Sequence, residues 1–227
     1  MDGVDVESGH RMYESDEVKT VLSLCDYTGN MVRPWAEAGY PCICVDVQHE
    51  GERTEGNITF LDADVRTWLP PKVDLQMVFA FPPCTHLASS GARWFKDKGL
   101  RALIDGLELV ERCRAICEWS GAPWMLENPV GTLSTYWRKP DYKFDPFEYA
   151  GYLDEPEADA YTKRTCLWTG GGFKMPAMRP HGDNLKSKMH LLPPGPDRAN
   201  QRSVTPQGFA KAVFLANSTC GKVGGER

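Results

Sequence analysis

The chain has 227 residues, of which 41% are hydrophobic and 25% are charged, and it carries a formal net charge of −5. This length fits one large domain, and no apolar stretch approaches the roughly 20 residues of a membrane helix, so we expect a soluble protein outside the membrane. The acidic balance argues mildly against a protein that coats nucleic acid nonspecifically, because Lys and Arg make the phosphate contacts.

Residues 1–16 are polar and acidic and lack both the basic start and the apolar core of a secretion signal, which predicts a flexible arm on a cytoplasmic protein. The eight cysteines are scattered and lie mostly in apolar runs, as expected of reduced core thiols. They form no CxxC pair with a matching second pair, and the five histidines make no ligand spacing. We therefore predict no metal site.

Short apolar runs alternate with helix-like segments along the chain. Residues 20–25 are a β-type run that ends in the turn Asp26-Tyr27-Thr28-Gly29-Asn30, and a helix is expected over 31–38. The remaining expected elements are strands over 40–47, 75–81, 124–126 and 165–168, a core-facing helix over 100–119, and a closing helix over 205–216. Ser203 or Thr205 is expected to cap the last helix, with Pro206 in its first turn.

This alternation predicts an α/β fold with a mostly parallel sheet and helices on both faces. Ligands of such sheets bind at the carboxyl ends of the strands. The residues that come at or just after predicted strands are Gly29, Asp46, Asp64, Cys84 and Glu127. They are therefore expected to share one rim of the sheet.

The first three of these residues indicate a cofactor site. Gly29 lets a ligand approach the backbone closely, and Asp46 is placed to accept hydrogen bonds from ribose hydroxyls. The turn is not GxGxxG, so Gly29 taken alone is better explained as part of a structural turn than as a ligand contact. Asp46 and Asp64 taken alone fit ordinary polar residues at strand ends as well as they fit ligand contacts. Together with Val65 the pattern is typical of an S-adenosylmethionine site, with ribose at Asp46 and adenine near Asp64-Val65.

A set of short motifs also stands in a characteristic order. These motifs are Leu22-Ser23-Leu24 through Gly29, Asp46, Asp64-Val65, Pro83-Cys84, Glu127-Asn128-Pro129, Lys163-Arg164 and Ser203-Val204-Thr205-Pro206. Over about residues 20–216 the chain resembles the DNA cytosine-5 methyltransferase family, as a short, phage-type member acting in a bacterial host cell. The resemblance implies a Rossmann-like methyltransferase fold, S-adenosylmethionine as cofactor, and duplex DNA with a flipped-out cytosine as partner.

The resemblance assigns a role to each reactive residue. Carbon 5 of cytosine is a poor nucleophile, so the Cys84 thiolate is expected to add to carbon 6 and give an enamine that takes the methyl group at carbon 5. Glu127 is expected to bind or protonate ring nitrogen 3, which asks for a carboxyl with a raised pKa in a dry pocket. Arg164 is assigned to the exocyclic oxygen 2, with Lys163 as a supporting phosphate or pocket contact.

The resemblance also implies a wider set of contacts. On the substrate side, Asn128 and Pro129 shape the turn after Glu127, and Ser89 and Ser90 belong to the loop after the nucleophile. The implied cofactor contacts are Leu24, Asp26, Thr28, Gly29, Asp46, Val47, Asp64, Val65, Pro82, Ser203 and Val204. A cysteine after Pro-Pro is by itself more often a core thiol, and only its pairing with Glu127 reverses that balance.

The chain departs from the family in two places. Residues 169–202, where the family inserts a large target-recognition region, are short and rich in Gly and Pro, so minimal sequence recognition is expected. The loop over 85–95 lacks the family's Gln after the cysteine, and its Ser-Ser-Gly hinge and Trp94 fit either closure over the substrate or plain packing. The predicted division is an arm (1–16), a catalytic core (17–168), the recognition segment (169–202) and a closing segment (203–227).

Other assignments stay open from the sequence alone. The same active site fits a free pyrimidine nucleotide or an RNA cytosine as substrate, or a modified group carried by a related cofactor. A catalytically silent nucleic-acid partner is a third interpretation, which the presence of both Cys84 and Glu127 disfavours. Amino-methyltransferases fit less well because Phe81 offers no oxygen for an exocyclic amine, and thymidylate synthases because the rest of the chain is typical of a nucleoside-cofactor sheet.

Overall fold

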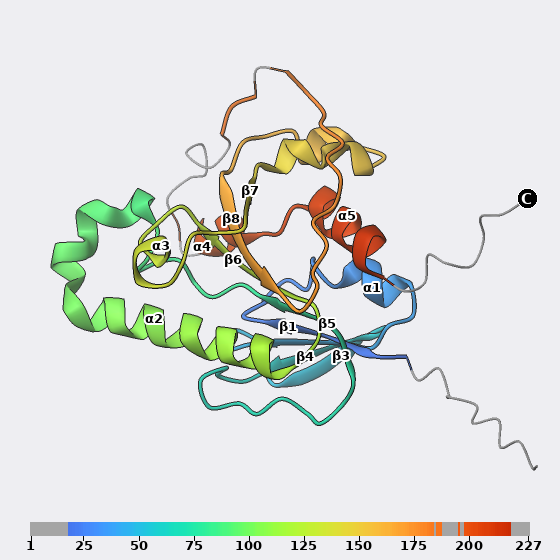
Figure 1. Cartoon of the computed structure of the whole chain (residues 1–227), viewed down its shortest axis with the longest axis horizontal. Coiled ribbons are helices and arrows are strands. Elements are labelled where there is room, and N and C mark those ends of the chain that lie inside the picture. The colour runs from blue at the N-terminus through green and yellow to red at the C-terminus, as the bar shows by residue number, and fades with distance from the viewer. Residues whose placement is uncertain (1–17, 184, 188–194, 196–197, 219–227) are drawn as a thin grey trace, which may run out of the picture.

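The computed structural model describes residues 18–183, 185–187, 195 and 198–218 (Figure 1). The strands are β1 (Thr20–Leu24), β2 (Cys42–Asp46), β3 (Glu52–Glu55), β4 (Ile58–Asp62), β5 (Leu75–Ala80), β6 (Trp124–Pro129), β7 (Tyr142–Phe144) and β8 (Thr165–Gly170). The α-helices are α1 (Arg33–Glu37), α2 (Phe95–Trp119), α3 (Leu133–Tyr136), α4 (Arg198–Ser203) and α5 (Gln207–Asn217). Short 3-10 helices are η1 (Ser89–Trp94), η2 (Pro146–Glu148), η3 (Ala150–Tyr152) and η4 (Pro156–Ala158). The predicted arm and residues 219–227 of the closing segment lie outside the described residues.

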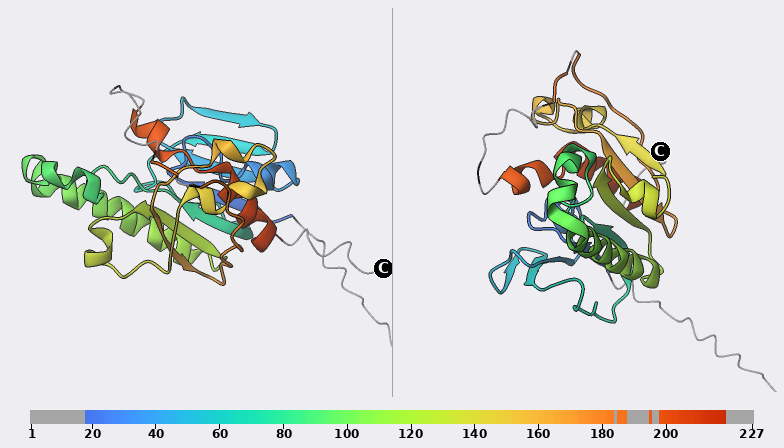
Figure 2. Two further views of the ribbon diagram at one scale, coloured as in Figure 1. Left: turned by 90° about the horizontal axis from the view of Figure 1, so that it is seen from above. Right: turned by 90° about the vertical axis from the view of Figure 1, so that its left-hand side faces the viewer.

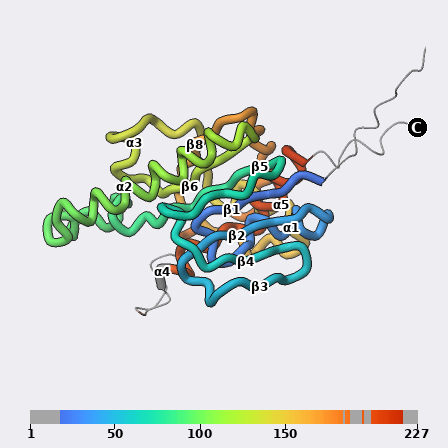
Figure 3. The backbone as a smooth tube through the Cα atoms, turned by 90° about the horizontal axis from the view of Figure 1, so that it is seen from below, coloured from blue at the N-terminus to red at the C-terminus, as the bar shows by residue number. Residues whose placement is uncertain are grey.

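The strands of the described chain form one sheet in the order β3-β4-β2-β1-β5-β6-β8-β7, and Figure 3 shows this order from β3 to β8. β4, β2, β1, β5 and β6 run parallel, whereas β8 is antiparallel to β6 and β7, and β3 is antiparallel to β4. The chain moves outward from β1 through β2 to β4 and then returns to the other side of β1 as β5, which creates a switch point between β1 and β5. The predicted α/β fold, with a mostly parallel sheet and helices on both faces, is confirmed.

Helices cover both faces of this sheet, as Figure 2 shows. Side chains of a strand alternate between the two faces. On β5, Met77 and Phe79 therefore enter the core under α1 and α5, whereas Val78 and Ala80 face the core under α2. The apolar run that ends just before Cys84 is thus buried on both sides, which holds the end of β5 rigidly.

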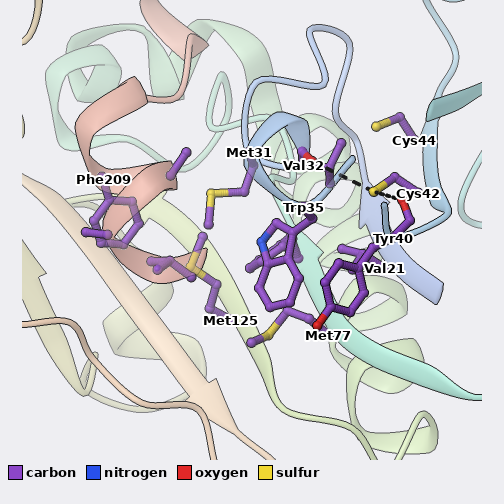
Figure 4. Packing of buried hydrophobic residues seen from close by; sticks show 14 of the residues in the cluster. Val21, Met31, Val32, Trp35, Tyr40, Cys42, Cys44, Met77, Met125 and Phe209 are labelled. Atoms are coloured by element: carbon purple, nitrogen blue, oxygen red, sulfur yellow. Dashed lines mark hydrogen bonds between the residues drawn. The ribbon is translucent and has the colours of Figure 1, made fainter. Parts of the chain in front are cut away.

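The core under α1 and α5 is built around Trp35, which is fully buried (Figure 4). The Trp35 ring meets Tyr40 edge-on at 5.3 Å between ring centroids and meets Phe214 of α5 edge-on at 5.2 Å. Edge-to-face pairs of this kind add to the free energy gained by burial alone. α1 has only five residues, so its place depends on this packing rather than on helix propensity.

α2 is the helix expected over 100–119, but it begins five residues earlier, at Phe95. Gly99 has φ 71° and ψ −178°, a backbone conformation that glycine adopts readily and that breaks the helix sharply. Beyond this break the buried residues of the helix form one stripe, namely Gly106, Val110, Cys113, Ile116 and Cys117. No helix in the described ranges, α2 included, combines the length and the apolar character that a membrane crossing requires.

The predicted cap of the closing helix is wrong. Pro206 occupies the N-cap position of α5, and neither Ser203 nor Thr205 caps it with a side-chain hydrogen bond. Instead, Asp159 Oδ2, from the loop after η4, accepts a hydrogen bond from the backbone N–H of Gly208 at 2.7 Å. A buried carboxylate at this place satisfies one of the N–H groups left open at a helix start and complements the helix dipole.

The sequence pattern does not predict β3, β4 or β7. β3 is exposed along its whole length and β7 has three residues, so neither shows an apolar alternation. β4 does alternate, with Ile58 and Phe60 buried, and is the one of the three that carries a readable signal. The predicted boundary between 168 and 169 falls inside β8, because the pairing of β8 with β6 continues to Gly170 opposite Trp124.

Candidate active site

The parallel strands on both sides of the switch point end at the same edge of the sheet, in register with one another. Leu24 on β1 pairs with Val45 on β2 and with Ala80 on β5. Ala80 in turn pairs with Leu126 on β6. The polar residues at or just beyond these strand ends are Asp26, Asp46, Cys84 and Glu127. They occupy the edge of the sheet at which ligands of such folds bind.

Cys84 is a half-buried thiol on this edge. Burial has the largest effect on its pKa and raises it, and the nearby carboxylate of Glu127 raises it further. The positive charges of Lys163 and Arg202 act in the opposite direction. Because the thiolate is the nucleophilic form, these two cations are the groups that favour its formation. Arg202, on α4, is a site residue that the sequence analysis missed. The only sequence feature that points to it is its position directly before the motif Ser203-Val204-Thr205-Pro206.

Glu127 lies on β6 and shares a small cleft with Lys163 and Ser203. Burial raises the pKa of the Glu127 carboxyl, and the positive charge of Lys163 opposes that shift. A carboxyl with a raised pKa can hold a proton and donate it near neutral pH. The free volume of the cleft is about 10 Å³, close to the space of one water, so a base has to widen it on entry.

Lys163 rather than Arg164 faces the reactive carboxyl. The two residues directly precede β8, and neighbouring side chains along an extended chain point to opposite sides. Lys163 lines the cleft, whereas the Arg164 guanidinium is half exposed and lies 3.2 Å from the carboxylate of Asp145. Asp145 also accepts a hydrogen bond from the backbone N–H of Lys163 at 2.8 Å. The structure therefore brings Lys163 into the site and leaves Arg164 in an ion pair outside it.

Asn128 connects β6, the strand of Glu127, to the Pro82-Pro83 turn that precedes Cys84. Its Nδ2 donates a hydrogen bond to the carbonyl of Pro82 at 2.9 Å, and the side chain is buried. Its Oδ1 is buried without a hydrogen-bond partner among the described residues. Pro129 remains within β6, opposite Thr165 of β8. Asn128, predicted to shape the turn after Glu127, also ties β6 to the segment after β5.

The loops that follow β5 and β6 are also tied to each other. A β-bridge pairs Ala88 with Gly131, and the Ser89 hydroxyl donates a hydrogen bond to the carbonyl of Val130 at 2.7 Å. The backbone N–H of Ser89 donates to the same carbonyl at 3.0 Å. Ser90 is exposed beside it. The expected Ser-Ser-Gly hinge is thus pinned at its first residue, and the break in the backbone lies further along, inside α2.

Gly131→Ala is expected to push these loops apart. A Cβ at Gly131 would lie 2.1 Å from the carbonyl oxygen of Leu87, a backbone atom that cannot rotate away. We expect the free energy of unfolding to fall by about 1–3 kcal/mol, as for other overpacked sites, in urea unfolding experiments. Gly195→Ala is the matched control, because a Cβ there meets nothing within 4 Å. Equal unfolding free energies for the two variants would contradict the tie between the loops.

The turn after β1 is organised by Asp26, whose carboxylate is buried and fully engaged within the turn. Its Oδ2 accepts a hydrogen bond from the Ser23 hydroxyl at 2.7 Å, and its Oδ1 accepts one from the backbone N–H of Gly29 at 2.8 Å and one from the Thr28 hydroxyl at 3.3 Å. Burial raises the pKa of Asp26, and these hydrogen bonds oppose the shift. Gly29 has φ 66°, and a Cβ there would lie 2.9 Å from the Phe60 ring. Backbone conformation and packing thus explain this glycine without a ligand.

Asp46 is the acidic residue at the end of β2. It is buried, and its Oδ1 accepts a hydrogen bond from the backbone N–H of Gln48 at 2.8 Å. Val47 follows it with 61% of its surface exposed, so an apolar contact lies next to the carboxylate. The carboxylate of Asp64 is held by Arg66 at 2.6 Å, and this hydrogen-bonded ion pair lowers the Asp64 pKa. Of these predicted cofactor contacts, Asp46 and Val47 have the surroundings that fit a ribose and an adjoining base.

The other predicted cofactor contacts differ in placement. Leu24 and Val65 are buried in the core under α2, which leaves only their backbone for a ligand. Ser203, the last residue of α4, lines the cleft, and its hydroxyl donates a hydrogen bond to the carbonyl of Asn200 at 2.8 Å. Val204 follows it and is half-buried. α4 thus reaches the cleft of Glu127 through Ser203, and its Asn200 Nδ2 donates a hydrogen bond to Oε1 of Gln48, just after β2, at 2.9 Å.

Two aromatic residues in the segments after β1 and β2 are absent from the predicted site. The Tyr27 ring stacks on His49 at 5.7 Å between centroids, and 43% of Tyr27 is exposed. His49 Nε2 is buried and has no hydrogen-bond partner among the described residues, while burial lowers the pKa of the ring. A buried polar atom without a partner is costly unless a ligand or a water satisfies it. Both residues come just after a strand end, which is the sequence signal that could have found them.

The charges around Cys84 predict how its reactivity depends on pH. Lys163→Met removes a cation, so the pKa of Cys84 should rise and the thiolate should form at higher pH. Glu127→Gln removes an anion, so the pKa should fall. The measurement is the pH dependence of iodoacetamide alkylation of Cys84, followed by peptide mass spectrometry. Arg164→Met is the matched control, and an equal shift in that variant would refute the placement of Lys163.

Among known proteins, the chain matches solved structures only. No protein-family model and no curated protein matches the chain. The CcbJ methyltransferase from Streptomyces caelestis matches with a TM-score of 0.31 and 11% identity, over 56% of this chain and 49% of that chain. The glycopeptide N-methyltransferase MtfA complexed with (S)-adenosyl-L-methionine matches with a TM-score of 0.28 and 14% identity, over 56% and 49%. A further MtfA structure has a TM-score of 0.28 and 12% identity, over 66% and 64%. The chain spans about half the length of the first two structures, and likenesses at these TM-scores carry no conclusion about activity.

Proposed function

We propose that the chain is an S-adenosylmethionine-dependent methyltransferase that acts on carbon 5 of cytosine in DNA. The observation that carries the proposal is the placement of Cys84 just beyond the end of β5 and of Glu127 on the adjacent parallel strand β6, where Glu127 and Lys163 both act on the pKa of Cys84. A thiol for carbon 6 and a carboxyl that holds a proton for nitrogen 3 are the two groups that covalent activation of a pyrimidine needs.

The two residues share the work in a balanced sequence. The Cys84 thiolate forms a bond to carbon 6 while Glu127 gives its proton to nitrogen 3, so the ring electrons move to carbon 5. After carbon 5 has taken the methyl group, water removes the carbon 5 proton and the carbon–sulfur bond breaks. Nitrogen 3 then returns its proton to Glu127. Both side chains leave the cycle as they entered it, and one proton is released for each methyl group.

S-adenosylmethionine, when bound, supplies the methyl group. On the cofactor side of the rim, the buried carboxylate of Asp46 and the exposed Val47 fit the ribose and the adenine. The orphaned Nε2 of His49 offers a further polar contact there. These residues hold the cofactor, whereas Cys84, Glu127 and Lys163 act on the base.

The direct test is the identification of the methylated product. The chain is incubated with S-adenosylmethionine labelled in the methyl group and with duplex DNA, single-stranded DNA, RNA or free dCMP. Enzymatic digestion and mass spectrometry then show which nucleoside carries the label. We expect labelled 5-methyldeoxycytidine from DNA. Label only in RNA or in the free nucleotide would change the substrate, and cofactor binding without label in any of the four would overturn the proposal.

A further inference from the structure

A second cavity, of about 320 Å³, lies beside the loop that follows Cys84. It is bounded by the start of α2 and by α3, and its apolar walls include Phe95, Leu100, Leu103 and Tyr136. None of its lining residues belongs to the cleft that holds Glu127. Its volume lies at the lower end of the range for small-ligand sites, so a single planar ring system fits it.

The break in α2 at Gly99 gives this cavity its shape. In Figure 1 the start of α2 turns back from the long part of the helix, at the end that projects from the sheet. Lys98, just before the break, lines the cavity, and its Nζ donates a hydrogen bond to the carbonyl of Thr85 at 2.6 Å. Thr85 directly follows Cys84, so the wall of the cavity is tied to the segment of the nucleophile.

His86 supplies a polar atom in this apolar wall. It lines the cavity, and its Nδ1 is buried without a hydrogen-bond partner among the described residues. Depending on the tautomer, a ring nitrogen donates or accepts a hydrogen bond, and the edges of nucleobases offer both kinds of group. A base in the cavity would therefore satisfy an atom that the protein leaves unpaired.

The segment over 85–100, part of which lines the cavity, has the charge and the aromatic surface that fit a nucleic-acid strand. Residues 85–100 contain three basic side chains, Arg93, Lys96 and Lys98, and one acidic side chain, Asp97, on a chain with a net charge of −5. Trp94 is 51% exposed, and the Arg93 guanidinium lies 5.1 Å from the centroid of its ring. Basic residues interleaved with exposed aromatic rings are typical of surfaces that bind single-stranded nucleic acid.

We propose that this cavity binds one unpaired base of the DNA strand that carries the target cytosine, with Arg93 and Lys96 on the flanking phosphates. The inference rests on the proposed function and narrows its substrate. A base has to leave the duplex stack to enter a cavity, which costs least where it is mismatched or unpaired. The preferred substrate is therefore single-stranded or locally unpaired DNA, and two bases of one strand are held at once.

The first test fills the cavity. Ala102→Phe places a ring inside it, whereas Ala115→Phe places the same ring at another half-buried position of α2 that does not line it. Fluorescence polarisation measures the binding of a labelled single-stranded oligonucleotide with one cytosine. We expect about tenfold weaker binding for Ala102→Phe and unchanged binding for the control, since one stacked base contributes about this much. If Ala102→Phe does not fold, Tyr136→Ala replaces it in the test. This variant changes a side chain that is 57% exposed, and it should also weaken oligonucleotide binding.

The second test locates the base. An abasic site is moved along the oligonucleotide one nucleotide at a time, in the wild type and in Ala102→Phe. At one position near the cytosine, the abasic site should weaken wild-type binding about tenfold and have no effect in Ala102→Phe, because the variant has already lost the same contact. Equal effects in both proteins at every position overturn the inference.

The outcomes separate the cavity from the chemistry. Methyl transfer by the wild type together with wild-type binding by Ala102→Phe and Tyr136→Ala would overturn the cavity site and leave the proposed function standing. Binding through the cavity without methyl transfer to any substrate would overturn the proposed function and leave the cavity site standing. Wild-type protein that binds no oligonucleotide at all overturns the cavity site, as expected if a protein partner fills it instead.

Discussion

Cys84→Ser should form no covalent complex with DNA that contains 5-fluorocytosine, and its rate of methyl transfer should fall by at least about 1,000-fold. A serine hydroxyl stays protonated at pH values where a thiol ionises, so it cannot replace the thiolate at carbon 6. In the wild type the adduct persists, because carbon 5 then carries fluorine in place of the proton that must leave. Denaturing gel electrophoresis and intact-protein mass spectrometry detect the complex.

Cys25→Ser is the matched control for this experiment. Cys25 and Cys84 are the two free cysteines among the described residues that are not fully buried. Cys25 directly follows β1, and its Sγ lies 3.9 Å from the Sγ of Cys113 on α2. The Cys25→Ser variant should therefore still trap DNA. An adduct that survives Cys84→Ser, or that disappears in the control alone, assigns the nucleophile elsewhere.

Trp35→Ala should lower the free energy of unfolding by about 3–5 kcal/mol, the usual cost of emptying a large aromatic site in a core. Trp35 is fully buried between the sheet and α5, and its ring has close partners in Tyr40 and Phe214, so the neighbours cannot collapse into the space. Urea unfolding followed by far-UV circular dichroism gives the value.

Trp119→Ala is the corresponding control, because 57% of Trp119 is exposed at the end of α2. We expect its free energy of unfolding to stay within about 0.5 kcal/mol of the wild type, as for most surface substitutions. A loss in Trp35→Ala no larger than this would show that the core under α1 and α5 contributes little to stability.

The sheet and its rim could be predicted because their signals are local. The runs that become β1, β2, β5 and β6 are mostly apolar and mostly buried, as expected for strands covered on both faces. The rule that ligands bind at strand ends then assembles residues far apart in sequence, such as Cys84 and Glu127, without knowledge of any contact. That step needs only the order of the strands.

The assignments that fail depend on contacts between distant segments. Whether Lys163 or Arg164 enters the cleft is decided by Asp145, which binds the backbone of one and the side chain of the other. Asp159 is the cap of α5 because a separate loop brings its carboxylate there. Arg202 acts on Cys84 only through the fold. Such pairings have no period or spacing in the sequence, so propensity and pattern cannot reveal them.

The contact between Trp35 and Phe214 also sets an order of events during synthesis. The segment through β5 leaves the ribosome first, with one apolar face of its strands still bare, since α5 is made long afterwards. Contacts this distant in sequence slow folding, and apolar surface left open in the meantime favours aggregation. The core under α1 and α5 can therefore be completed only after almost all of the described chain has been translated.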